Sequence, residues 1–150
     1  MKAVIVDIDG TLADVSGIRH FLLRDSGSKN FEAFHDASVD VPAHEHVVRM
    51  VREFKRDGFA ILIVTARKQK FLFHTLLWMD ENAIPHDHIW MRGNKDNRPD
   101  FLVKSEILAN IRACGFDVQH AVDDNPAVIA LWESEGIPHT IVPGWVVTEP

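Results

Sequence analysis

A pair of aspartates directly follows a short apolar run near the start of this chain, and the two features together limit the folds that it can adopt. Residues 3–6 read Ala-Val-Ile-Val, which is typical of a strand buried on both faces of a parallel sheet. Asp7 and Asp9 lie two positions apart, which points both carboxylates to the same side of an extended chain, and Gly10 then favours a tight turn. The two acids are therefore expected at the carboxyl end of a strand, where ligands bind in open α/β sheets.

Two carboxylates held this close repel each other unless a proton or a cation lies between them. A divalent metal ion is the natural counter-ion for such a pair at a ligand-binding edge. The same residues could instead form an Asp-X-Asp-Gly loop that only turns the chain, so the metal hypothesis needs support from the rest of the sequence.

The remainder of the chain alternates predicted helices with predicted strands. Apolar runs predict strands over residues 59–64, 89–91, 118–122 and 139–142, and helical spacing predicts helices over residues 42–57, 69–83, 100–113 and 126–135. Strands separated by helices predict a three-layer, Rossmann-like α/β fold with a parallel sheet of about five strands. In the second of these helices, the residues expected to face the core are Phe71, Leu72, Leu76, Leu77 and Trp78.

Residues 13–41 lie between the first strand and the first helix and carry scattered Ser, Gly, Asp and His residues. Connections of this length in compact domains often act as lids or binding loops. We expect a small insertion with one or two helical turns that serves as a minimal cap, within a single domain spanning residues 1–150.

Composition indicates where the protein works and what it contacts. Its formal net charge of −6 argues against broad, nonspecific nucleic-acid binding but allows a local basic patch. A single cysteine excludes an internal disulfide framework, and the opening apolar run is too short for a signal peptide or a membrane span. We therefore expect a cytoplasmic protein with no membrane partner. Nothing in the sequence indicates an oligomeric state.

Polar residues follow three of the predicted strands. Asp7 and Asp9 follow the first strand, Thr65 follows the second, and Asp123 with Asp124 follows the fourth. Because the carboxyl ends of parallel strands share one edge of a sheet, these side chains are expected to lie close together.

Lys104 adds a cation to this set. It lies four residues after Asp100 on a predicted helix, so the two side chains share one helix face. Taken singly, Thr65 could simply end a strand, Lys104 could be solvated, and Asp124 could cap a helix. The order of an acidic pair, a hydroxyl, a helical lysine and a second acidic pair is far more specific than any one of its parts.

With this order of residues the sequence resembles the haloacid-dehalogenase-like phosphohydrolase superfamily, whose first motif, Asp-X-Asp-Gly-Thr, matches residues 7–11. Within that superfamily it is most similar to the 3′-phosphatase domain of the bacteriophage polynucleotide kinase-phosphatases. The other matching segments are residues 65–67, 100–104 and 116–132. The chain has no Gly-X-X-X-X-Gly-Lys-Ser/Thr loop, so only the phosphatase half of those enzymes is matched.

The resemblance implies a magnesium-dependent phosphomonoesterase. Asp7 would attack phosphorus and become an aspartyl phosphate, and Asp9 would protonate the departing alcohol and later deprotonate a water molecule. Thr65 and Lys104 would hold the phosphoryl oxygens. The residues implied in substrate binding are Thr11, Arg19, Arg67 and Asp100. The implied ligands of Mg²⁺ are Asp7, the backbone carbonyl of Asp9, and one acid of the pair Asp123 and Asp124.

The sequence allows two classes of substrate. The short insertion leaves the predicted site accessible, and this favours the 3′-phosphate of a polynucleotide end. The cations that would flank such a strand are Arg67, Lys68, Arg92, Lys95 and Arg98. The alternative is a phosphatase of free nucleotides or of another small phosphorylated metabolite.

A phosphorylatable receiver-type signalling module is the alternative of another class. It also combines acids, a threonine and a lysine on a parallel sheet. In the receiver pattern, however, the phosphorylated aspartate lies on a middle strand of the sequence and the lysine at a strand end, whereas here Asp7 follows the first strand and Lys104 lies within a predicted helix.

Overall fold

A computed structural model describes residues 1–22 and 31–144 of the chain. The described strands are β1 (Lys2–Val6), β2 (Ala60–Lys68), β3 (His88–Arg92), β4 (Asp117–Asp123) and β5 (His139–Ile141). The α-helices are α1 (Phe31–Ala37), α2 (Glu45–Arg56), α3 (Leu72–Glu81), α4 (Asp100–Ala113) and α5 (Pro126–Ser134). Short 3₁₀ helices are η1 (Ser16–Leu22), η2 (Ser38–Asp40) and η3 (Gln69–Phe71).

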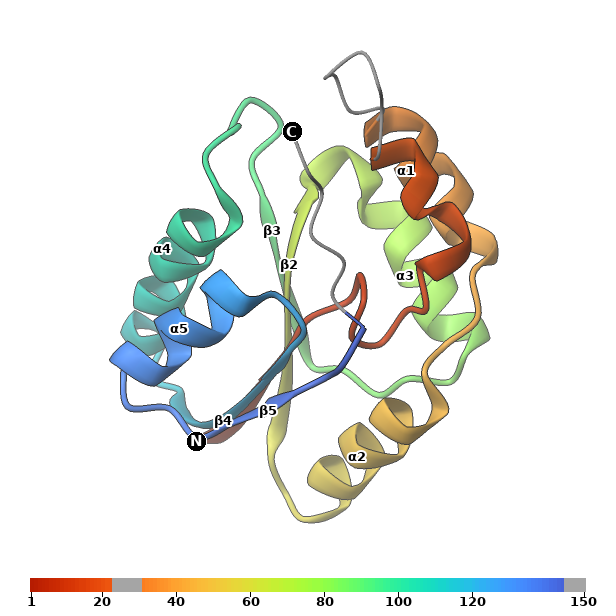
Figure 1. Cartoon of the computed structure of the whole chain (residues 1–150). Helices are drawn as coiled ribbons and strands as arrows, with labels where there is room; N and C mark the ends of the chain where they lie inside the picture. The colour runs from red at the N-terminus through yellow and green to blue at the C-terminus, as the bar shows by residue number, and fades with distance from the viewer. Residues whose placement is uncertain (23–30, 145–150) are drawn as a thin grey trace.

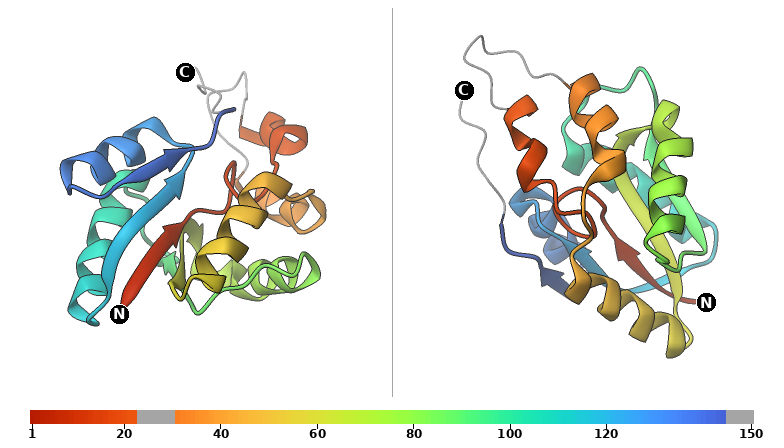
Figure 2. Two further views of the ribbon diagram at one scale, coloured as in Figure 1. Left: turned by 90° about the horizontal axis from the view of Figure 1, so that it is seen from below. Right: turned by 90° about the vertical axis from the view of Figure 1, so that its right-hand side faces the viewer.

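The strands form a parallel sheet in the order β3-β2-β1-β4-β5, with helices on both faces (Figure 1). Helices α4 and α5 cover one face, while α1, α2 and α3 lie on the other, and two further views show the same layers (Figure 2). The predicted three-layer α/β fold is confirmed. Because β1 lies between β2 and β4, its carboxyl end opens at the centre of the sheet edge.

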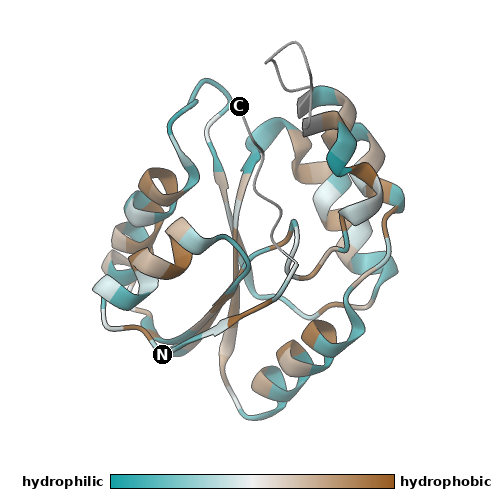
Figure 3. Ribbon diagram, in the orientation of Figure 1, coloured by the Kyte–Doolittle hydropathy of each residue, from teal (hydrophilic) through white to brown (hydrophobic). Residues whose placement is uncertain are grey.

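Alternation along the buried strands divides the core in two. Val4 and Val6 pack in the cluster that contains α2 and α3, whereas Ala3 and Ile5 pack in the cluster that contains α4 and α5. Figure 3 shows apolar residues along the central strands, whereas apolar and polar residues alternate along the helices. If the alternation continues past the end of a strand, each residue that follows it points to a predictable face of the sheet. None of the described helices is both long and apolar enough to cross a membrane.

The end of β2 differs from the sequence prediction. The strand does not stop at Val64 but continues through Thr65 to Lys68, and its pairing with β3 shifts register between Thr65 and Lys68. Such an irregularity re-aims the side chains beside it. It lies at the edge of the sheet where the polar residues were expected to meet.

The predicted inward face of the helix after β2 is wrong in part. Leu72 and Leu77 are 39% and 41% exposed, whereas Thr75 and Met79 are fully buried beside Trp78. The first turn is the 3₁₀ helix η3, and α3 begins only after it. The phase of the α-helix consequently brings a polar residue, Thr75, against the core.

The connection after β1 is anchored in the core at several points. Phe34 of α1 is buried in the cluster that contains α2 and α3, and Trp78 Nε1 donates a hydrogen bond to the carbonyl of Val41 at 2.8 Å. The predicted insertion of residues 13–41 includes residues 23–30, which lie outside the described residues. Its action as a cap stays a prediction.

Candidate active site

Lys104 joins Asp7 and Asp123 at the centre of the carboxyl edge. Asp7 follows β1 on the side of Ala3 and Ile5, which faces α4, and Lys104 projects from α4 toward it. Lys104 Nζ donates to Asp7 Oδ1 at 3.0 Å and to Asp123 Oδ2 at 2.7 Å. Each of these three side chains is at most 9% exposed. One acid of each predicted pair and the helical lysine therefore meet in one buried cluster.

The turn after β1 brings a hydroxyl and a further acid into this cluster. Thr11 Oγ1 lies 3.1 Å from Asp7 Oδ2 and 3.3 Å from Asp124 Oδ1. Gly10 has a φ of +82°, and a Cβ atom there would lie 1.9 Å from Asp124 Oδ2. Only glycine fits at this position, because any side chain would collide with the Asp124 carboxylate.

Burial and crowding shift the pKa values of these groups. Burial raises the pKa of Asp7 well above its usual range, and the neighbouring Asp123 carboxylate raises it further. Burial also raises the pKa of Asp124, to about 6, and Asp123 again adds to the effect. For Lys104, burial alone would lower the pKa, but the carboxylates of Asp123 and Asp7 outweigh burial and raise it. The cluster therefore favours additional positive charge.

The buried acids have the donor set of a hard divalent cation. Asp7, Asp123 and Asp124 each offer one carboxylate oxygen, and these oxygens lie within 4.8 Å of one another. Asp124 Oδ2 is buried and has no hydrogen-bond donor among the described residues, although Arg19 Nη2 lies 3.6 Å away. Carboxylate oxygens are the ligands that Mg²⁺ prefers. The cluster fits the predicted magnesium ion, and the Asp9 carbonyl as a ligand stays a prediction.

Arg67, predicted to bind substrate, is paired with Asp9 in the structure. Its Nε donates to Asp9 Oδ2 at 2.9 Å and its Nη2 to Asp9 Oδ1 at 2.5 Å, while Nη1 donates to Thr75 Oγ1 at 3.0 Å. Burial alone would lower the pKa of Arg67, but the Asp9 carboxylate outweighs burial and raises it. The Arg67 backbone N–H donates to Thr65 Oγ1 at 3.2 Å, so the Thr65 hydroxyl can still donate its own proton.

Asp100, also predicted to bind substrate, is paired with Arg92. Arg92 Nη2 donates to Asp100 Oδ1 at 2.7 Å, and Nε donates to the carbonyl of Ala66 at 2.8 Å. Nη1 donates to the backbone carbonyls of Asp96 and Arg98. Arg92 thus joins the end of β2 to the loop before α4, and Asp100 contributes to the site by holding this arginine.

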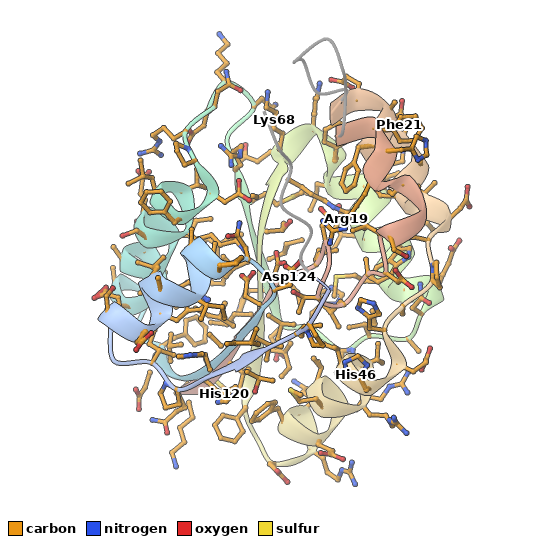
Figure 4. The ribbon with its side chains drawn as sticks, in the orientation of Figure 1. Arg19, Phe21, His46, Lys68, His120 and Asp124 are labelled. Atoms are coloured by element: carbon orange, nitrogen blue, oxygen red, sulfur yellow. The ribbon has the colours of Figure 1, made fainter. Side chains whose placement is uncertain are left out.

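A cavity of about 510 Å³ lies over this edge of the sheet. The basic residues that line it are Arg19, Arg67, Lys68, Lys70, Arg92, Arg98 and Lys104, whereas Lys95 does not line it. Figure 4 shows Arg19 close to Asp124 at the centre of the molecule, with Lys68 farther along β2. Several of the cations are paired with acids that also line the cavity, as in the pairs Lys70–Glu32, Arg98–Asp96 and Arg92–Asp100.

The match to a protein family covers nearly the whole chain. The family model described as "Polynucleotide kinase PNKP phosphatase domain" matches residues 1–143. The chain belongs to this family of phosphatase domains. The resemblance to haloacid-dehalogenase-like phosphohydrolases, and within them to polynucleotide kinase-phosphatases, is thereby confirmed.

Solved structures share the fold of this phosphatase domain. A chain in a structure of the Pnkp1/Rnl/Hen1 complex has a TM-score of 0.78 and 22% identity, and the match covers 94% of this chain and 45% of that one. The class C acid phosphatase from Bacillus anthracis with tungstate bound has a TM-score of 0.72 and 16% identity, over 95% and 66% of the two chains. CbbY from Rhodobacter sphaeroides in complex with phosphate has a TM-score of 0.58 and 15% identity, over 95% and 86%. The phosphatase domain spans less than half of two matched Pnkp1/Rnl/Hen1 chains, 45% and 42%.

The motifs of the phosphatase domain do not predict a role for Thr75, and they place Arg92 only in a flanking basic patch. Two signals could have found Thr75. It lies three and four residues before Trp78 and Met79, so helical spacing groups the three on one face. Arg67 lies two and four residues after Thr65 and Ile63, so strand alternation directs it toward the same layer. No comparable local signal indicates that Arg92 is only 7% exposed.

Proposed function

We propose that this domain is a magnesium-dependent phosphomonoesterase that acts through an aspartyl phosphate on Asp7. The observation that carries the proposal is the position of Asp7, a buried carboxylate at the end of the central strand, bonded to Lys104 and lining a cavity with further acids and cations. Membership of a phosphatase-domain family supports the same chemistry.

The reaction would proceed in two displacements at phosphorus. In the first, a carboxylate oxygen of Asp7 forms a bond to phosphorus, the bond from phosphorus to the alcohol oxygen breaks, and Asp9 gives its proton to that oxygen. In the second, water attacks the aspartyl phosphate and gives a proton to Asp9, so that inorganic phosphate leaves and the Asp7 carboxylate is restored. Asp9 suits both steps because it lines the cavity two residues beyond Asp7.

Charge compensation would make the attack of one anion on another possible. Asp7, Asp123 and Asp124 would hold a magnesium ion, which when bound favours the ionised form of Asp7 and lessens its repulsion from the phosphoryl group. Lys104 would keep Asp7 oriented through its bond to Oδ1. The Thr65 hydroxyl, which can still donate its proton, would bind a phosphoryl oxygen.

Arg67 would serve both Asp9 and the substrate. In the free protein both oxygens of Asp9 accept hydrogen bonds from its guanidinium. The anionic phosphoryl group would compete with Asp9 for these donors, since charge-assisted bonds from arginine suit phosphate as well as carboxylate. This competition loosens the pair and lets Asp9 carry the proton that the first displacement needs.

The substrate we propose is the 3′-phosphate of a polynucleotide end. Basic side chains from separate segments line the cavity, among them Arg19, Lys68 and Lys70, and such residues bind a phosphate backbone without reading its sequence. The family model, built on the phosphatase domain of a polynucleotide kinase, supports this choice. A small phosphorylated metabolite is the second candidate, because Lys70 pairs with Glu32 and less positive charge is then offered to a polymer.

The test compares kcat/KM, with magnesium present, for a 3′-phosphorylated oligonucleotide, its 5′-phosphorylated counterpart and a nucleoside 3′-monophosphate. We expect the first to be hydrolysed at least about tenfold better than the others, equivalent to about 1.4 kcal/mol in transition-state binding, with a rate that falls as salt rises. Lys68→Gln should weaken only the oligonucleotide reaction, while Lys2→Gln, on the exposed start of β1, should change nothing. About tenfold preference for the free nucleotide would favour the metabolite phosphatase instead.

A further inference from the structure

Thr75 is a buried polar residue on a helix face that otherwise packs apolar side chains. It is fully buried in α3, on the same face as Trp78 and Met79. The hydrogen bond from Arg67 Nη1 at 3.0 Å is the one polar contact of its hydroxyl among the described residues. A valine would have the same shape there, so the hydroxyl contributes through Arg67 and not through packing.

The Arg67 guanidinium is held from two sides. Its Nε and Nη2 face the Asp9 carboxylate, and its Nη1 faces Thr75. The Arg67 side chain is 1% exposed, so water cannot replace a missing partner on the Nη1 side. Among the described residues, the hydrogen bond to Thr75 is the side-chain contact that holds this guanidinium independently of Asp9.

We infer that Thr75 is a positioning residue for protonation of the leaving group, acting through Arg67 on Asp9. The inference rests on the proposed function, in which the phosphoryl group draws on Arg67 and loosens its pairing with Asp9. At that moment the bond to Thr75 keeps the plane of the guanidinium in place, and Asp9 stays beside the departing oxygen. Without the hydroxyl, Arg67 follows the phosphoryl group and Asp9 loses its fixed orientation.

This role predicts a dependence on the leaving group that a general loss of folding would not produce. An alcohol leaves only with a proton, whereas p-nitrophenolate leaves without one, so misplacing Asp9 harms the first reaction far more than the second. Both substrates carry the same phosphoryl group, so a change in phosphoryl binding or in the fraction of active protein lowers both rates equally. kcat/KM is the appropriate quantity, because it includes steps only through the first irreversible one, the departure of the leaving group.

The experiment measures kcat/KM in wild type, Thr75→Val and Thr75→Ser for p-nitrophenyl phosphate and for whichever nucleotide 3′-phosphate the wild type hydrolyses best. We expect Thr75→Val to lose about tenfold more on the nucleotide than on p-nitrophenyl phosphate, a part of what general acid catalysis supplies. Thr75→Ser restores the hydroxyl and should recover most of the nucleotide rate. The matched control is Thr140→Val, which removes a hydroxyl bonded to His120 at 2.7 Å, and His120 lies away from Asp124 (Figure 4).

The outcomes separate the inference from the proposed function. Equal losses on the two substrates, or a failure of Thr75→Ser to restore the nucleotide reaction, would overturn the positioning role while the phosphatase activity stands. A wild type that hydrolyses neither substrate with magnesium present would overturn the proposed function, and the role of Thr75 with it.

Discussion

An aspartate lies beside a lysine at each end of the sheet, and the two sites differ in how their charge is balanced. At the amino end, Asp87 accepts hydrogen bonds from Lys55 Nζ and from the backbone N–H of Ile61, both at 2.7 Å. At the carboxyl end, Lys104 is shared between Asp7 and a second acid, and a third acid lies close by. The side chains of Lys55 and Asp87 are 46% and 30% exposed, whereas that of Lys104 is 2% exposed.

The surroundings of each aspartate determine what its carboxylate does. Burial would raise the pKa of Asp87, but the hydrogen bonds from Lys55 and Ile61 outweigh it and lower the pKa. The pKa of Asp7 is raised instead, because burial and neighbouring acids act together. A carboxylate that accepts enough hydrogen bonds links two structural elements. Several carboxylates that share one lysine carry excess negative charge and form a site for a cation.

The largest contrast is expected in activity when each aspartate is changed to asparagine. Asp7→Asn keeps the shape and the acceptor oxygen but removes the attacking charge, so turnover should fall by several orders of magnitude in a folded protein. Asp87→Asn should leave turnover nearly unchanged, because Asp87 lies at the opposite end of the sheet. Rates on the best phosphomonoester, with circular dichroism as a check of folding, provide the measurement. Near-normal turnover by Asp7→Asn would remove Asp7 from the mechanism.

Much of the candidate active site is predictable from the sequence, because it depends on patterns of residues that lie close together in the chain. A buried strand is a continuous apolar run, and parallel strands bring their carboxyl ends to one edge whatever the intervening loops do. Asp7, Thr65, Lys104 and Asp123 accordingly line one cavity, as the order of the motifs indicates. The periodicity of α4 alone is enough to direct Lys104 to the face that carries Ile107 and Leu108.

A second contrast is expected in stability when each lysine is changed to methionine. Lys104→Met leaves Asp7 and Asp123 buried without their shared donor, so the free energy of unfolding should fall by about 3–5 kcal/mol. Lys55→Met removes an exposed pair and should lower it by less than about 1 kcal/mol. Urea unfolding in the presence of a chelator measures both. Equal losses in the two variants would show that burial does not distinguish the two ends of the sheet.

The pairing of the arginines could not be predicted in the same way, because it depends on details of three-dimensional placement. Arg67 reaches both Asp9 and Thr75 only because β2 continues past Thr65 and because α3 begins at Leu72. A one-residue change in the start of that helix would replace Thr75 by another side chain on the inward face. The hydrogen bonds of Arg92 likewise depend on backbone carbonyls at the end of β2 and in the loop before α4, and a motif of side chains cannot predict these.

The smallest contrast is expected from Asp124 in protein freed of metal. Because its pKa in the folded state, about 6, lies above the ordinary value of 3.8, the ionised group destabilises the fold above pH 6, and wild-type stability rises as pH falls through that value. Asp124→Asn cannot ionise and keeps the acceptor for Thr11, so it should be more stable than wild type at pH 7.5. The difference should shrink toward pH 5 in urea unfolding with chelator. A less stable variant at pH 7.5 would contradict the account of this carboxylate.

Magnesium should reverse the order of stability of wild type and Asp124→Asn. If Asp124 is a ligand, magnesium should raise the melting temperature of wild type at pH 7.5 and raise that of Asp124→Asn much less, since binding to the folded state alone stabilises it. Asp117→Asn is the matched control and should respond to magnesium as wild type does, because Asp117 is an exposed acid on β4 whose carboxylate accepts a hydrogen bond from Gln119 Nε2. An equal response in all three proteins would place the magnesium site elsewhere.

The role of Asp7 as the nucleophile is tested by identifying the residue that carries the phosphoryl group during turnover. Wild-type protein is mixed with magnesium and excess phosphomonoester, quenched in acid within the first turnover, digested with pepsin at low pH and analysed by tandem mass spectrometry. We expect a phosphoryl group on Asp7 and none on Asp9 or Asp14, which lie close to it in the sequence. A phosphoryl group on another residue, or full turnover with none trapped on Asp7, would contradict this role of Asp7.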